Sequence, residues 1–156
     1  MLMILVSLSV SCCIGPYEQN GTLRYQNGTL ELKITPEEIH VEKGDIFNVQ
    51  LSLTNEGNTS LNVVEMEEFF SFNVIYANGS QLDYETMPSV LPPDDSSLVT
   101  LNPHESLNIN ASSQEWWFEK GRHNLSALYF VTGDSYIGTP HWRGTVRANN
   151  ISLFVE

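Results

Sequence analysis

Residues 47–54 alternate strictly between apolar and polar side chains, and this pattern constrains the fold more than any other feature of the chain. Its apolar members are Phe47, Val49, Leu51 and Leu53. Successive side chains of a strand point to opposite faces, so the alternation predicts a β-strand with one face buried and one exposed. A chain that contains such a strand must supply further strands to pair with it and a second layer to cover its apolar face.

Shorter segments of the same kind recur between turn signals along the rest of the chain. They occupy residues 30–34, 39–41, 59–65, 70–76, 81–84, 98–101, 107–111, 125–131 and 151–155. No segment has apolar residues at helical spacing. We therefore predict an all-β domain over residues 29–156, an immunoglobulin-like antiparallel β-sandwich of about seven to nine strands. Long loops are expected at residues 85–96, which hold three prolines, and at 132–144.

Several stretches resemble parts of immunoglobulin-like extracellular modules. Lys43-Gly44-Asp45 leading into Phe47–Asn55 resembles their second strand, and Leu101–Ser106 resembles their mid-domain turn. Two further pairs of segments, 118–121 with 125–131 and 142–144 with 149–155, resemble the last hairpin of small bacterial and archaeal sandwiches. In this respect the chain is similar to the BsuPI-type proteinase-inhibitor family. The resemblance implies a sandwich fold, but no inhibitory loop residue can be matched one by one.

Residues 1–11 are almost wholly apolar and lead directly to Cys12 and Cys13, the only cysteines of the chain. The run is shorter than the roughly 20 residues that span a bilayer, and it fits the apolar region of a signal peptide. Cys12-Cys13-Ile14-Gly15 resembles the processing site of archaeal-type lipoproteins, which implies a lipid on Cys13 or, failing that, on Cys12. Residues 1–13 are then a signal peptide with its lipobox, and 14–28 a tether. An ordinary cleaved signal, or a buried first strand with inert thiols, are the alternatives.

Seven of the fourteen asparagines begin an Asn-X-Ser/Thr sequon. They are Asn20, Asn27, Asn58, Asn78, Asn110, Asn124 and Asn150. Asn-Gly pairs suit tight turns, and this explains the sequons at positions 20, 27 and 78 without a glycan. It leaves four unexplained, so we expect N-glycosylation at some of the seven, in agreement with export.

The formal net charge of −12 repels phosphate backbones, so we expect no nucleic-acid partner. The sequence contains no nucleophile motif, no phosphate-binding loop and no metal-ligand spacing. Its four histidines are scattered, and we expect them on the surface. They are His40, His104, His123 and His141. Catalytic residues, cofactors and bound metals are therefore not expected, and the chain is interpreted as a non-enzyme.

Alternation along the last strands leaves Leu128, Phe130 and Phe154 on an outer face, where we expect them to form one apolar partner surface. The sequence as a whole suggests a lipid-anchored binding or structural module on the extracellular face of the cell membrane, with a protein or carbohydrate partner. The alternative is a proteinase inhibitor or enzyme-regulating module that presents the loops 85–96 and 132–144.

Overall fold

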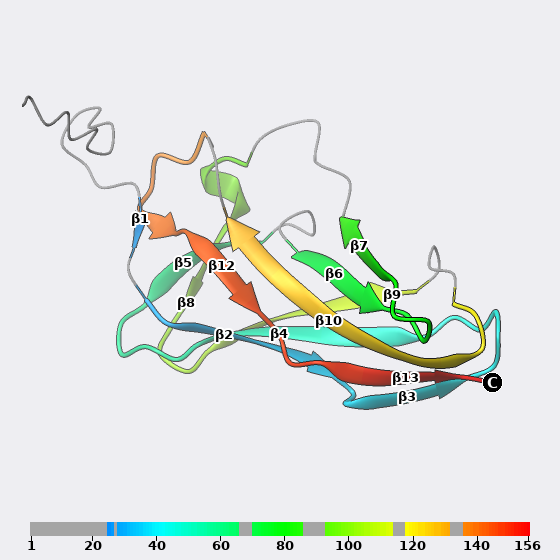
Figure 1. The fold of residues 1–156 in the computed structure, drawn as a ribbon. Coiled ribbons are helices and arrows are strands. Elements are labelled where there is room, and N and C mark those ends of the chain that lie inside the picture. The colour runs from blue at the N-terminus through cyan, green and yellow to red at the C-terminus, as the bar shows by residue number, and fades with distance from the viewer. Residues whose placement is uncertain (1–24, 27, 66–69, 86–92, 114–117, 132–135) are drawn as a thin grey trace, which may run out of the picture.

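The larger sheet is built around one long strand, β10 (Gly121–Val131), in a computed structural model that describes residues 25–26, 28–65, 70–85, 93–113, 118–131 and 136–156 (Figure 1). Its spatial order is β3 (Glu38–Val41), β13 (Ile151–Val155), β10, β6 (Phe70–Ile75) and β7 (Gln81–Glu85), with β12 (Gly144–Arg147) also on β10. Because β10 pairs with three strands, it positions most of this sheet.

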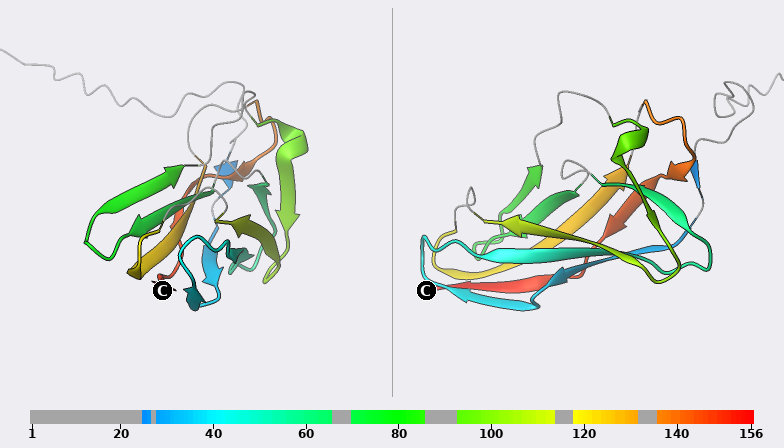
Figure 2. Two further views of the ribbon diagram at one scale, coloured as in Figure 1. Left: turned by 90° about the vertical axis from the view of Figure 1, so that its right-hand side faces the viewer. Right: turned by 180° about the vertical axis from the view of Figure 1, so that it is seen from behind.

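The second layer faces this sheet and is seen apart from it in the view along the strands (Figure 2, left). It contains β2 (Leu30–Thr35), β4 (Asn48–Asn55) and β9 (Ser106–Ser112) in that order. Two small ladders extend the structure, β5 (Leu61–Val64) with β8 (Leu98–Leu101) and β1 (Tyr25–Gln26) with β11 (His141–Trp142). The single turn of 3₁₀ helix η2 (Asp95–Ser97) precedes β8. Within the described ranges, no helix has the length and apolar character needed to cross a bilayer.

The predicted class, an immunoglobulin-like β-sandwich, is confirmed, and its core follows the predicted alternation. Val49, Leu51 and Leu53 of β4 are buried, whereas Asn48 and Gln50 between them are exposed. The structure adds β1, β11 and β12, which the sequence did not predict, and it begins β10 four residues before the predicted Leu125. Two pairings are parallel rather than antiparallel, β3 with β13 and β1 with β11.

The consecutive strands β2 and β3 belong to different layers. β2 pairs with β4 in one sheet, and after the cis Thr35-Pro36 bond β3 pairs with β13 in the other. Proline has no backbone N–H and is found at the margins of a ladder, so Pro36 is suited to the point where the chain leaves one sheet. The crossing joins the two layers at one edge.

A β-bulge interrupts the strand opposite β10. Leu125 pairs with Ile151 and Leu128 with Arg147, so three steps along β10 face four steps along its partner. The three residues between β12 and β13, 148–150, therefore face only two residues of β10, which is one residue more than regular pairing allows. Asn149 lies in this bulge, and its side-chain Oδ1 accepts the N–H of Ile34 at 3.0 Å while its Nδ2 donates to the Ile34 carbonyl at 3.3 Å. The bulge thus directs an amide that bonds to β2 of the opposite sheet.

We expect Asn149→Ala to lower the free energy of unfolding by about 1–3 kcal/mol, because it leaves both backbone groups of buried Ile34 without this partner. Urea denaturation of the unglycosylated protein measures it. Asn150→Ala is the matched control, since Asn150 is exposed like Asn149 but the bonds to Ile34 come from Asn149, and it should change the free energy of unfolding by less than about 0.5 kcal/mol. Equal losses in the two variants would contradict the bridging role.

Candidate functional site

Two segments far apart in the sequence are bonded together at one end of the sandwich, and we call residues 93–97 and 136–143 the loop pair. Oδ1 of Asp95 accepts the backbone N–H groups of Gly138 at 3.1 Å and Thr139 at 2.9 Å. The Tyr136 N–H donates to the Pro93 carbonyl at 3.0 Å. These bonds connect the described parts of the two long loops that the sequence predicted, 85–96 and 132–144.

The acidic pair Asp94-Asp95 stabilises backbone structure rather than facing an open site. Oδ1 of Asp94 accepts the N–H of Ser96 at 2.8 Å and its hydroxyl at 2.5 Å, which caps η2. The bond from the Ser96 hydroxyl, with that from its N–H, lowers the pKa of Asp94. The backbone N–H of Thr139 is the main cause that lowers the pKa of Asp95. Both carboxyls are therefore ionised at neutral pH and act as hydrogen-bond acceptors.

His141 follows the loop pair and is fully buried. Its Nδ1 lies 3.0 Å from the Thr139 carbonyl, which can only accept, so Nδ1 carries the proton. Its Nε2 accepts the Nε–H of Arg143 at 3.3 Å. Burial lowers the pKa of His141 below its ordinary value, and the neighbouring Arg143 lowers it further. The imidazole is thus neutral at neutral pH, with both nitrogens engaged in structural bonds.

Asn62 of β5 connects the loop pair to the strands beneath it. Its Nδ2 donates to the Pro140 carbonyl at 2.9 Å, and its Oδ1 accepts the Thr100 hydroxyl at 2.7 Å. Its backbone N–H donates to Oε1 of Gln26 at 2.7 Å. One residue therefore holds β1, β8 and the second loop together.

The loop pair presents one aromatic side chain to solvent. Tyr136 is 77% exposed, the largest value among the exposed large hydrophobic side chains, whereas the next residue, Ile137, is fully buried and anchors the segment. The described residues contain no group of three or more histidine, cysteine, aspartate or glutamate side chains able to hold a metal ion. The titratable side chains Asp94, Asp95 and His141 of the loop pair are engaged in structural hydrogen bonds.

The predicted modification sites lie partly outside the described residues. Cys12, Cys13, Asn20 and Asn27 fall outside them. The other five sequon asparagines are all exposed, and these are Asn58, Asn78, Asn110, Asn124 and Asn150. The structure thus leaves each of these five side chains accessible, while their occupancy by glycans stays a prediction.

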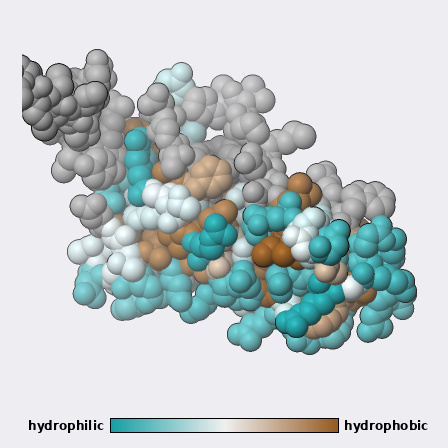
Figure 3. Space-filling view, in the orientation of Figure 1, coloured by the Kyte–Doolittle hydropathy of each residue, from teal (hydrophilic) through white to brown (hydrophobic). Residues whose placement is uncertain are grey.

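The predicted contiguous surface of Leu128, Phe130 and Phe154 is wrong in its geometry. Phe154 pairs with Arg122, six residues along β10 from Leu128, which is about 20 Å along a strand. The stretch of β10 around Leu128 and Phe130 pairs with β12 instead. Phe154 stacks on His40 at 4.7 Å, and the Arg122 guanidinium lies 5.5 Å from its ring centre. On the face in Figure 3, apolar surface accordingly appears in small areas between hydrophilic residues.

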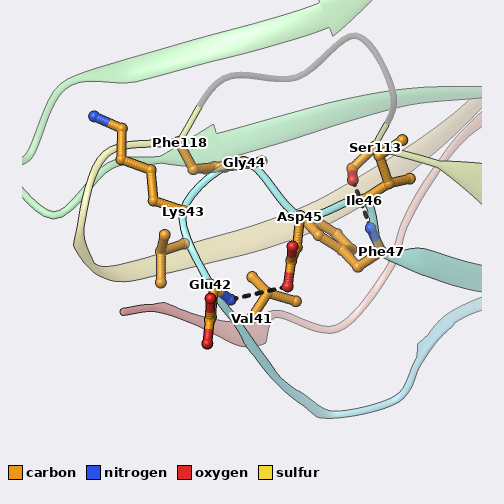
Figure 4. A pocket seen from close by; sticks show the side chains of 10 residues that line it. Val41, Glu42, Lys43, Gly44, Asp45, Ile46, Phe47, Ser113 and Phe118 are labelled. Atoms are coloured by element: carbon orange, nitrogen blue, oxygen red, sulfur yellow. Dashed lines mark hydrogen bonds between the residues drawn. The ribbon is translucent and has the colours of Figure 1, made fainter.

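A small cavity of about 130 Å³ lies at the opposite end of the sandwich from the loop pair (Figure 4). Val41 and the turn after β3, residues 42–46, form one wall, and the rest is lined by Phe47, Ser113, Phe118 and Val155. Ser113 is buried, and its hydroxyl oxygen accepts the Phe47 N–H at 2.9 Å. Its volume suits no ligand larger than a single small ring.

Two of the four histidines are buried, which corrects the expectation that all lie on the surface. Like His141, His123 is almost fully enclosed, with Nδ1 accepting the Ala77 N–H at 3.2 Å and Nε2 2.7 Å from the Glu119 carbonyl. Phe118 and Tyr76 contact its ring edge to face. The sequence signal that could have found it is its place in the alternation of β10, where it precedes Leu125 by two residues.

No family model matches the chain, and no curated protein matches its sequence. Among solved structures it is similar to the sporulation control protein Spo0M of Bacillus subtilis, with a TM-score of 0.45 and 10% identity over 83% of this chain and 50% of that one. It is also similar to a beta-glucosidase of Listeria innocua, with a TM-score of 0.42 and 13% identity over 94% of this chain and 19% of that one. A third similarity is to an ASH/PapD-like domain of human CEP192, with a TM-score of 0.34 and 14% identity over 97% of this chain and 98% of that one. The chain spans about half the length of Spo0M.

We expect the free energy of unfolding to fall as the pH drops below 6.5. The pKa of His141 is lowered in the folded protein, so below this pH the unfolded chain binds a proton at His141 that the folded protein does not bind. One such proton gives a slope of at most about 1.4 kcal/mol per pH unit. Urea denaturation between pH 5 and 8 measures it. His141→Asn should flatten the slope, whereas His104→Asn, at an exposed left-handed position, should keep it. An unchanged slope in the first variant would refute the assignment.

Proposed function

We propose that the chain is an exported β-sandwich module, anchored by a lipid on Cys13 to the extracellular face of the cell membrane. It acts without catalysis, by binding a protein or carbohydrate partner there. The proposal is based on the apolar run that ends at Cys12-Cys13-Ile14-Gly15 and on the seven sequons.

The exposure of the five described sequon asparagines supports this proposal most directly. Asn124 carries the greatest weight, because it lies within β10, where the residues on either side, His123 and Leu125, are 1% and 0% exposed. A strand places alternate side chains on opposite faces, so the register of β10 leaves room for a glycan at this position. A shift of one residue would bury the asparagine.

The state of the loop pair supports a non-catalytic role. A general acid or base needs a free proton position near a substrate. Asp94 and Asp95 accept bonds from Ser96 and from the second loop, and His141 has both ring nitrogens engaged. These side chains are suited to holding the loop pair in one shape rather than to transferring a proton.

Replacement of Cys13 tests the anchor. In native membranes the full chain should carry a mass increment for lipid on Cys13 and should partition into detergent. Cys13→Ser should move at least nine-tenths of it to the aqueous phase, whereas Cys12→Ser, the matched control, should leave partitioning unchanged. The same mass spectrum counts the attached glycans. An intact protein that begins at Met1 without lipid would reject the anchor.

The bonds within the loop pair favour one alternative, a proteinase inhibitor that presents the exposed Tyr136. A rigid loop with one exposed aromatic side chain is a suitable contact for a proteinase cleft. On this alternative the purified chain slows at least one member of a panel of serine, cysteine and metallo-proteinases. Tyr136→Ala should then weaken inhibition at least tenfold, and Ile46→Ala, exposed at the other end, should not. Full activity of every proteinase would reject the alternative.

A further inference from the structure

The last described residues of the predicted tether, 25–26 and 28, are bonded to the loop-pair end of the domain. Tyr25 pairs in parallel with His141, and Gln26 pairs with Trp142. The indole N–H of Trp142 donates to the Gly28 carbonyl at 3.1 Å. A Cβ on Gly28 would lie 2.4 Å from a methyl of Leu61, so the chain passes close against β5. The tether therefore leaves the domain from one defined end.

The two ends of the sandwich are separated by about the length of its longest strand. β10 has eleven residues, which corresponds to about 36 Å, and it runs from the end that carries the turn 42–46 toward the loop pair. Figures 1 and 2 show β1 and η2 at one end and the turn after β3 at the other. From Cys13 to Tyr25 there are twelve Cα steps, which reach at most about 40 Å.

We propose that the loop-pair end faces the membrane and that the end with the turn 42–46 points away from it. This inference rests on the proposed lipid anchor at Cys13. A nearly fully extended tether is required before the far end can approach the anchor as closely as the loop pair does, and such extension carries a large loss of chain entropy. Orientation therefore follows from where β1 is bonded.

The surface that meets the membrane is suited to uncharged or zwitterionic headgroups. Tyr136 combines a ring with a hydroxyl, as do the aromatic residues that gather at membrane interfaces. Asp94 and Asp95 beside it, in a chain of net charge −12, disfavour an anionic lipid surface. A soluble partner would then reach the other end first, where Ile46 is 60% exposed beside the cavity.

Energy transfer from a labelled cysteine to an acceptor lipid tests the orientation. The lipidated full chain, with Cys12→Ser and one reporter cysteine, is reconstituted in phosphatidylcholine vesicles. Tyr136→Cys reports on the loop pair, and Glu42→Cys, an exposed position in the turn, reports on the far end. We expect at least twofold more efficient transfer from position 136. Inserting about thirty Gly and Ser residues after Leu23 should bring the ratio close to one, because the tether then exceeds the length of the domain.

The outcomes separate the orientation from the anchor. Vesicle-bound protein with equal transfer from the two positions, or with more from position 42, overturns the orientation and leaves the anchor standing. Protein that does not bind vesicles overturns both. A twofold ratio that persists after the insertion overturns the role of the tether in setting the orientation. Equal urea midpoints of the two labelled proteins show that neither reporter disturbs the fold.

Discussion

The buried side chain of Tyr129 joins parts of the molecule that strand pairing leaves separate. Its hydroxyl accepts the Val64 N–H at 3.0 Å and lies 3.2 Å from the Val64 carbonyl, which ties β10 to β5. Its ring packs on Phe70 at 4.8 Å and stacks on Trp142 at 5.7 Å. Burial raises the pKa of Tyr129 well above its ordinary value, so the donor proton is retained. Through these contacts Tyr129 joins β10 to β5 and to β11, which belongs to the loop pair.

Three asparagine side chains also cross-link separate parts of this domain. Asn55 donates to the carbonyls of Thr59 and Leu101 at 2.8 and 3.0 Å, Asn62 joins β5 to β8 and the second loop, and Asn149 joins the bulge to β2. An amide offers both a donor and an acceptor, so it can replace a strand's backbone at places where regular pairing stops. Each of the three lies at such a place, a turn, a short ladder or a bulge.

Strand positions could be predicted from the sequence because a strand with one buried face alternates between apolar and polar side chains, as β4 does. Register could not, because alternation shows which face a side chain occupies but not which residue of the partner strand lies opposite it. The predicted proximity of Phe154 to Leu128 failed because β13 pairs with residues 121–125 of β10, whereas β12 is the strand that pairs beside Leu128. The loop pair was missed for a related reason: Asp95 and His141 bond mainly to backbone groups, which every residue carries, so no sequence pattern marks their partners. β1 and β11 are two residues each, too short to show any alternation.

The placement of both cysteines before the domain has a consequence for the conditions in which it folds. Cys12 and Cys13 are the only thiols of the chain, so residues 29–156 fold without any disulfide. The amide cross-links of Asn55, Asn62 and Asn149 need no oxidant to form. A reducing cytosol and an oxidising exterior should therefore yield the same folded domain, and its stability should be independent of redox potential.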